Sequence, residues 1–368
     1  MNYLLLISLS FSIFYFLFLF KVRKGIRLLP KNIGVNNSTE FVSVIVPFKN
    51  ESENIVRAIQ SLEKQSYPKE LLEILFINDD SIDDSISKFD SLAKSPNIKL
   101  LSVPKEFHPD KRKIRAIKYG IENANGELIV TTDCDCIHNP NWLQSMVNCF
   151  SDDTGFVSGP VKFEKNNNFT NKLQELEFAG LILTGAGLIG LNRPAICNSA
   201  NIAYRKRLIE LVNKPEEETV IDESLLIKAV TETKYKIRFC WDKDAIVETK
   251  PVENIAGFMK QRIRWATFNW LSLPKSILVS LIFIFFFYLS IPILFFYGLF
   301  GNPEFLPGFA FCFAIKSFAD YEVLREDKKF LIEELSLKVF LVAGIFHIPY
   351  IIFSVISAFL FKVNWKGK

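Results

Sequence analysis

The stretch VTTDCDCIHNP at residues 130–140 alternates two aspartates with two cysteines directly after an apolar run. If this run is a strand, residues i and i+2 share a face, so Asp133 and Asp135 point one way and Cys134 the other. Two neighbouring carboxylates repel each other unless a cation lies between them. Oxygen ligands favour Mg²⁺ or Mn²⁺, and Mg²⁺ sites usually combine one or two carboxylates with substrate phosphates. The pair therefore predicts a divalent-metal site.

Two other interpretations of this stretch stay open at the level of the residues. Asp135 could simply begin the turn before His138, or Cys134 and Cys136 could bind zinc. The zinc interpretation is the weaker one, because these thiols leave the carboxylate face and have no second thiol pair nearby in sequence. The six cysteines include no C-x-x-C pair, so we expect free thiols.

Three further charged residues stand where they could meet a ligand. Asp79, in FINDDSIDD, belongs to a helix-capping turn or accepts hydrogen bonds from a nucleotide base or ribose. Lys113, in KRKIRAIKYG, lies on a solvated helix face or reaches a phosphate. Asp222, at the end of the acidic run in EEETVIDESLL, is the carboxylate there that could act as a general base.

A basic and aromatic segment, KQRIRWATFNW at 260–270, precedes a long apolar run. Such a segment beside a membrane is most often an interfacial anchor with snorkelling cations. Gln261, Arg264 and Trp265 also fall within about one helical turn of each other. This trio could offer a guanidinium to a diphosphate and an indole to a sugar or lipid.

Alternating strands and helices must position these residues. Strands with helices of ten or more residues between them predict a mainly parallel sheet covered on both faces. Ligands of such sheets bind at the carboxyl ends of the strands, so the acidic turns at 78–84 and 133–135 are expected to meet in one crevice. The expected strands are 41–48, 72–78, 98–103, 126–133 and 154–163, with a helix at 111–124.

Apolar runs at both ends of the 368-residue chain predict a membrane protein. Residues 3–20 carry no charge and a basic KVRKGIR follows, which indicates an uncleaved anchor with residue 21 onward in the cytoplasm. Runs at 276–300 and 339–361 are long enough to span, and a weaker one at 304–319 makes the C-terminal count two or three. The 14-residue run at 178–191 is expected to be a buried helix, since it is too short to span. A net charge of +4 is too small to indicate nucleic acid.

Six stretches together resemble one family in order and spacing. The chain resembles a membrane-bound, inverting family-2 glycosyltransferase of the Rossmann-like GT-A fold, in the group with cellulose, hyaluronan and poly-N-acetylglucosamine synthases and ceramide glucosyltransferase. The resemblance covers roughly 41–270 and implies an anchor at 1–24, a catalytic domain at 40–250, an interfacial segment at 251–275 and a membrane region at 276–368. The stretches are VSVIVPFKNESENI, FINDDSIDD, KIRAIKYGIENANGELIVTTDCDCIHNPNWL, CNSANIAYRKR, IDESLL and QRIRW.

The resemblance implies a role for each candidate residue. Nucleotide-sugar binding falls to Pro47, Glu51, Asp79, Lys113 and Asp133, with Asp79 on the uracil. A divalent metal, Mg²⁺ or Mn²⁺, would be held on the diphosphate by Asp133 and Asp135. Asp222 is the implied catalytic base, and Gln261, Arg264 and Trp265 lie at the diphosphate and acceptor.

The sequence departs from the family pattern in three places. Asn78 and Asp80 alter the usual D-D-G-S turn, although Asp tolerates a positive φ. The base motif reads VID, which leaves Glu223 as a rival for Asp222. Ser199 replaces a usual glycine in the acceptor-side loop.

The first hypothesis is a UDP-sugar-dependent transferase acting on a lipid or glycan at the cytoplasmic membrane face. A nucleotidyltransferase on the same type of sheet, and a catalytically silent membrane subunit that binds a nucleotide-sugar, are the alternatives.

Overall fold

The computed structural model describes residues 3–31, 40–93, 95–107, 112–212, 223–267 and 273–360. The chain forms two compact units. The sheet unit comprises Leu29–Glu164 and Ile196–Lys250, and the helical unit comprises Met1–Leu28, Lys165–Ala195 and Pro251–Lys368. Residues 165–195 therefore join the apolar helices, although they lie inside the predicted catalytic range of 40–250.

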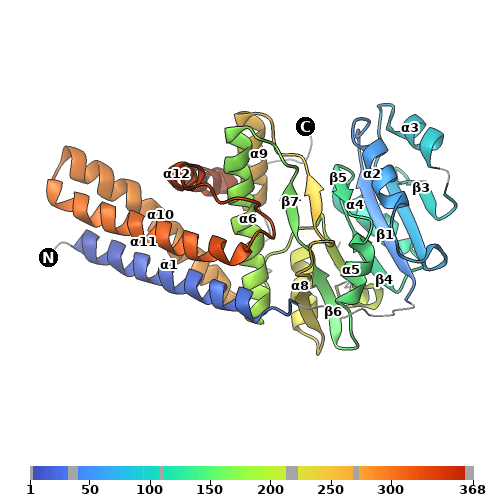
Figure 1. Ribbon diagram of the computed structural model, residues 1–368, viewed down its shortest axis with the longest axis horizontal. Helices are drawn as coiled ribbons and strands as arrows, with labels where there is room; N and C mark the ends of the chain where they lie inside the picture. The colour runs from blue at the N-terminus through green and yellow to red at the C-terminus, as the bar shows by residue number, and fades with distance from the viewer. Residues whose placement is uncertain are drawn as a thin grey trace. The chain divides into compact units, whose positions relative to one another are not determined.

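The sheet unit is built on a seven-stranded sheet with the order β3-β2-β1-β4-β8-β6-β9 (Figure 1). The strands β3, β2, β1 and β4 run parallel, whereas β8 is antiparallel to both β4 and β6. This confirms the predicted mainly parallel α/β fold. The bounds are β1 Val42–Phe48, β2 Leu72–Asn78, β3 Ile98–Ser102, β4 Leu128–Thr131, β6 Thr154–Ser158, β8 Ile202–Arg205 and β9 Lys236–Phe239. Helices α2 Ile55–Glu63, α3 Ser85–Leu92, α4 Arg112–Glu122, α5 Trp142–Asn148, α7 Ile209–Val212 and α8 Glu223–Thr231 accompany it, with 3₁₀ turns η1 Lys69–Leu71 and η2 Lys206–Leu208.

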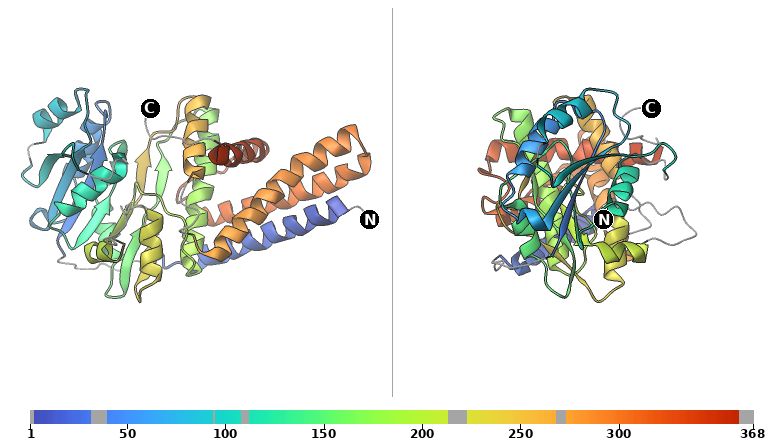
Figure 2. Two further views of the ribbon diagram at one scale, coloured as in Figure 1. Left: turned by 180° about the vertical axis from the view of Figure 1, so that it is seen from behind. Right: turned by 90° about the vertical axis from the view of Figure 1, so that its right-hand side faces the viewer.

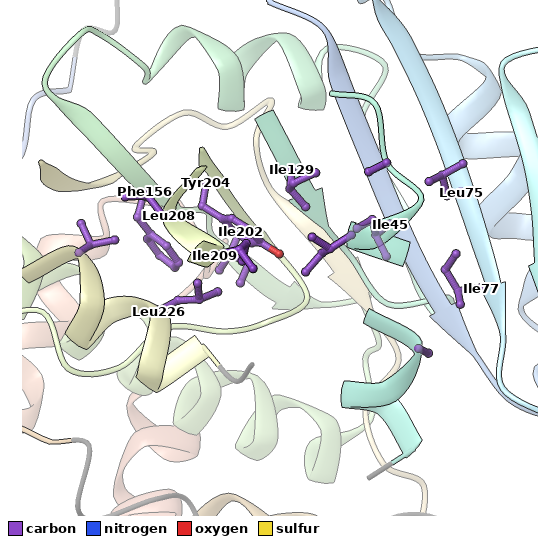
Figure 3. Packing of buried hydrophobic residues seen from close by; sticks show 14 of the residues in the cluster. Ile45, Leu75, Ile77, Ile129, Phe156, Ile202, Tyr204, Leu208, Ile209 and Leu226 are labelled. Carbon is purple, nitrogen blue, oxygen red and sulfur yellow. The ribbon is translucent and has the colours of Figure 1, made fainter. Parts of the chain in front are cut away.

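The two central strands β1 and β2 are buried along their whole length. Parallel strands covered on both faces read as continuous apolar runs, which is why they were predictable. On one face, Ile45, Leu75 and Ile77 belong to a cluster of buried side chains that continues to Phe156 on β6 (Figure 3). A Cβ at Gly120 of α4 would lie 2.8 Å from Cγ2 of Ile45, so glycine lets α4 approach the sheet closely.

The predicted strand 154–163 was wrong as a single element. It divides into β6 and β7 (Val161–Phe163), which belong to different sheets. The break falls at Gly159 and Pro160, where proline lacks the N–H that a continuing central strand would need. β7 instead pairs with β10 (Val247–Thr249), which also pairs with β5 (Cys136–His138) in a three-stranded sheet.

Among the residues that the structure describes, the helical unit has four helices long and apolar enough to cross a membrane: α1 Tyr3–Leu28, α6 Phe169–Gly190, α10 Lys275–Phe300 and α12 Leu337–Leu360. Its other described elements are α9 Ile255–Ala266, α11 Leu306–Leu324, η4 Pro303–Phe305 and η5 Arg325–Asp327. Helices α1, α10 and α11 lie side by side, and α6 runs across them near one end (Figures 1 and 2). The length and composition of these helices indicate a membrane protein.

Helix α6 corrects the length assigned to the run at 178–191. The helix has 22 residues rather than 14, so length alone does not prevent it from spanning. The predicted close packing through small residues is present. A Cβ at Gly187 would lie 2.5 Å from the carbonyl oxygen of Val22, and one at Gly190 would lie 2.1 Å from that of Gly25. Helices α1 and α6 therefore contact each other backbone to backbone.

The lysine in the weaker apolar segment at 304–319 points into the interior of the helical unit. Lys316 of α11 is fully buried, and its Nζ lies 2.7 Å from Oδ2 of Asp320. The hydroxyl of Tyr15, on α1, donates to Oδ1 of the same aspartate. Ionisable groups at membrane depth face the bundle interior and pair with one another, and this one follows that rule.

Candidate active site

The Asp133–Asp135 stretch forms a tight turn at the carboxyl end of β4. β4 ends at Thr131, and the backbone N–H of Cys136 donates to the carbonyl of Asp133 at 3.1 Å. The prediction that both aspartates lie on a strand and share its face was therefore wrong, because this hydrogen bond reverses the chain. Both carboxylates are nevertheless half-exposed at the edge where the parallel strands end.

The cysteines of this turn are buried and do not have the chemistry of zinc ligands. The thiol of Cys136 donates to Oδ1 of Asp135 at 3.6 Å. Burial, and then the negative charges of Asp135 and Asp133, hold the pKa of Cys136 well above its usual value. Because the thiolate is the metal-binding form, a thiol held protonated is a poor ligand. None of the six cysteines forms a disulfide.

Lys113 on α4 lies against the turn. Its Nζ is 2.6 Å from Oδ1 of Asp133 and donates to Oγ of Ser199 at 3.2 Å. Ser199 precedes β8, and its carbonyl accepts a hydrogen bond from the Thr131 hydroxyl at 3.1 Å. The structure thus brings together a predicted phosphate-side lysine, a predicted metal ligand and the serine that departs from the family pattern.

Asp79 directly follows β2 and pairs with a second cation, Arg115, that the sequence interpretation missed. Its side chain is only 3% exposed, and Oδ1 accepts from Nε of Arg115 at 3.0 Å and pairs with Nη2 at 2.9 Å. Arg115 lies in the same basic run as Lys113, so its type was visible in the sequence. Its partner was not, because the ion pair joins positions 36 apart in the chain.

The loop after β1 is tied to the turn after β2 by three backbone N–H groups. Those of Asn50 and Glu51 donate to the hydroxyls of Ser81 and Ser85 at 3.0 and 2.9 Å. That of Ser52 donates to Asp83 at 3.0 Å. Burial opposes ionisation of Asp83, but hydrogen bonds from Ser85 and Ser52 outweigh it and lower its pKa. The Asp83 carboxylate therefore links the loop after β1 to the turn after β2, in addition to its bond near the start of α3.

The departures from the usual turn sequence are accommodated by the backbone. Asn50 and Asp80 adopt positive φ angles of 53° and 61°, a conformation that Asn and Asp tolerate. The side chain of Asn78 accepts from the N–H of Ser81 at 2.9 Å and so closes the turn. Asn50 to Asn54, which include Glu51, line a cavity of about 290 Å³. Pro47 belongs to β1, before this loop.

Both ring nitrogens of His138 are hydrogen-bonded beside the acidic turn, so neither is free for proton transfer. The Nε2 atom lies 2.8 Å from the hydroxyl of Thr132, and Nδ1 lies 3.2 Å from that of Ser61. Burial lowers the pKa of His138 to about 3, so the ring is neutral at physiological pH. The residue fixes the position of the chain just before Asp133.

The carboxylates fit a divalent cation that is shared with phosphates. In the described part of the chain no group of three or more His, Cys, Asp or Glu side chains could hold a metal by itself. Mg²⁺ does not require one, because one or two carboxylates plus substrate phosphates suffice. Asp133 already holds a cationic ammonium, and both aspartates supply only oxygen ligands.

The remaining predicted site residues are Asp222, with its rival Glu223, and the trio Gln261, Arg264 and Trp265. Asp222 lies outside the described residues, and Glu223 begins α8 without a described side chain. Gln261, Arg264 and Trp265 lie on α9 in the helical unit. Arg264 is exposed, and Trp265 stacks on Phe178 of α6 with ring centroids 5.6 Å apart.

Residues 43–212 match the family described as Glycosyl transferase family 2. Glycosyltransferase AglE of Haloferax volcanii is 24% identical over 235 residues, 62% of this chain and 73% of its own length. A poly-beta-1,6-N-acetyl-D-glucosamine synthase of Staphylococcus epidermidis is 24% identical over 277 residues, 72% of this chain but only 64% of the synthase.

A solved structure has the same fold along nearly the whole chain. It is the mannosyltransferase PcManGT from Pyrobaculum calidifontis in complex with GDP-Man and Mn²⁺, with a TM-score of 0.61 and 17% sequence identity. The match covers 97% of this chain and 99% of the mannosyltransferase. It confirms the GT-A fold predicted from the sequence.

Proposed function

We propose that the chain, whose residues 43–212 match Glycosyl transferase family 2, transfers a sugar from a UDP-sugar, with inversion, to a lipid or glycan acceptor. The observation that carries the proposal is the row of charged side chains at the ends of β2 and β4. There Arg115 meets Asp79, and Lys113 meets Asp133. Nucleotides bind at this edge of parallel sheets.

The donor would lie along this row. Pro47, Glu51 and Asp79 are proposed to hold the nucleoside, and Lys113 the phosphates. Asp133 and Asp135 would hold Mg²⁺ or Mn²⁺, which supplies positive charge to the departing nucleoside diphosphate. Asp79 is buried against Arg115, so we propose that the Asp79–Arg115 ion pair binds the nucleobase as a whole.

The acceptor side is assigned from the motifs. Asp222 is proposed to take the proton from the acceptor hydroxyl. The hydroxyl oxygen then displaces the nucleoside diphosphate at the anomeric carbon, which inverts that centre. Gln261, Arg264 and Trp265 are proposed to serve the diphosphate and the acceptor.

We place the reaction at the cytoplasmic face of the inner membrane. Arg23 and Arg27, near the end of α1, pair with Glu326 at 2.9 and 2.6 Å. Arg23 also pairs with Glu322 at 2.5 Å. These contacts bring the ends of α1 and α11 to the same side of the helical unit, and the excess of Lys and Arg near the C-terminal end of α1 favours the cytoplasm for that side.

A panel of nucleotide-sugars tests the proposal. Purified full-length protein is incubated with UDP- and GDP-sugars, Mn²⁺ or Mg²⁺ and a membrane lipid extract, and the nucleoside diphosphate and product are measured by mass spectrometry. We expect UDP release and a product of inverted anomeric configuration, read by NMR. Consumption of GDP-sugars alone would overturn the donor assignment, and a retained configuration would overturn the mechanism.

Lys113 is expected to compete with the metal in the free protein. Its ammonium lies 2.6 Å from Asp133, so replacement of Lys113 by Met should raise Mn²⁺ affinity without nucleotide by about fivefold, the factor that corresponds to a partly exposed ion pair of about 1 kcal/mol. Calorimetric titration measures the change. Lys118→Met, on the same helix, is the matched control. An unchanged or weaker affinity in Lys113→Met would contradict the competition.

A further inference from the structure

Arg262 is a buried cation in the middle of the QRIRW motif. It lies on α9 and is only 4% exposed. Its Nε atom lies 2.9 and 3.1 Å from the two carboxylate oxygens of Glu177 on α6, and Nη2 pairs with the same carboxylate. A two-pronged contact of this kind fixes the plane of the guanidinium as well as its position.

Glu177 is held from a third helix. The hydroxyl of Tyr350, on α12, donates to Oε1 of Glu177 at 2.6 Å. The carboxylate therefore links α6, α9 and α12. Removal of one partner from a buried ion pair is costly, because it leaves the other charge buried without compensation.

The guanidinium contacts two of the three predicted motif residues. It lies 4.3 Å from the centroid of the Trp265 ring and 4.2 Å from that of Phe258, and Nη1 donates to the side-chain oxygen of Gln261. Trp265 is held on another side by Phe178, the neighbour of Glu177 on α6. Arg264 is exposed.

We propose that Glu177 is a positioning residue for sugar transfer, acting through Arg262 to hold Gln261 and Trp265 in their working orientation. The proposal rests on the proposed function, which gives those two side chains the acceptor and the diphosphate. A helix backbone sets only the starting direction of a side chain, and its rotamer is decided by its neighbours. Both side chains share the Arg262 guanidinium as a neighbour, whose own position is fixed by Glu177, and Tyr350 in turn holds Glu177.

Replacement of Glu177 by Gln tests the role, because it keeps the shape of the side chain and removes its charge. A misplacement of about 1 Å can cost about 100-fold in rate, so we expect kcat for transfer to fall by about 10- to 100-fold. The KM for the donor should change less than kcat, since the proposed contacts to the nucleoside and the metal are made by residues of the sheet unit. Glu175→Gln, two residues earlier on α6, is the matched control and should retain the wild-type kcat.

Three further measurements separate positioning from a general loss of folding. Tyr350→Phe removes one hydrogen bond from Glu177 and should lower kcat by about three- to tenfold in a protein that elutes and melts as the wild type does. Trp265 emission should shift in Glu177→Gln, and the shift should disappear in a Trp265→Phe background. A double variant, Glu177→Gln with Arg262→Gln, should lose less activity than the product of the single losses.

The outcomes distinguish this proposal from the proposed function. If the wild-type protein transfers no sugar from any donor, the proposed function has failed. If the wild type transfers sugar while Glu177→Gln behaves as Glu175→Gln does, the positioning role is overturned. A rise in the donor KM with unchanged kcat would also overturn it.

Discussion

Replacement of Asp222 by Asn is expected to reduce the rate of sugar transfer by about 100- to 10,000-fold, the range over which positioned general bases contribute. The amide keeps the size of the side chain but cannot accept the proton of the acceptor hydroxyl. Donor affinity should remain within about twofold, because the proposed nucleotide contacts are made by other residues. Single-turnover transfer and calorimetric donor binding measure the two quantities separately.

Glu223→Gln is the matched control for this substitution, since it alters the neighbouring carboxylate in the same way. A larger loss in Glu223→Gln than in Asp222→Asn would move the base to Glu223. If both variants kept wild-type transfer, neither carboxylate would be the base. Unchanged cellular glycan in Asp222→Asn cells would support the hypothesis of a silent nucleotide-sugar-binding subunit.

Replacement of Asp135 by Asn is expected to lower transfer by about 100- to 1000-fold and to weaken Mn²⁺ binding in the presence of the nucleoside diphosphate. The loss follows from the charge that a bound cation supplies to the leaving group, which is worth several kcal/mol. Asp135 is the sharper choice of the two, because Asp133 also holds Lys113. Transfer is measured over a Mn²⁺ series, and excess metal should restore part of the rate.

Asp152→Asn, at an exposed position in the same unit, controls for the loss of one surface charge and should behave as the wild type. Removal of metal by EDTA should stop transfer by the wild-type protein, and added Mn²⁺ should restore it. Full transfer in EDTA would show that the aspartates act without a metal.

The strands that form the middle of the sheet were predictable because each is buried on both faces. FVSVIVPF and LEILFIN are long apolar runs, and they became β1 and β2 within one or two residues. The ends of elements were less predictable. β4 stops at Thr131 because the N–H of Cys136 turns back to Asp133, and the expected strand at 154–163 divides at Pro160 because proline cannot continue a ladder.

The ion-pair partners of the charged residues could not be predicted from the sequence, because they are distant in the chain. Arg115 and Arg262 are visible as basic residues, but Asp79 and Glu177 stand 36 and 85 positions away in the chain. Arg262 stands within the QRIRW motif, beside the three predicted site residues Gln261, Arg264 and Trp265. No local pattern indicates which distant carboxylate a guanidinium meets.

By itself the sequence determined which chemical groups stand at the strand ends and on the motif helix, because apolar runs and motif spacing are properties of neighbouring residues. Only the tertiary structure decided that Lys113 faces Asp133, that Arg115 faces Asp79 and that Glu177 holds Arg262. Those pairings depend on how strands and helices far apart in the chain pack together. Packing is set by the burial of the whole core, which no single stretch contains.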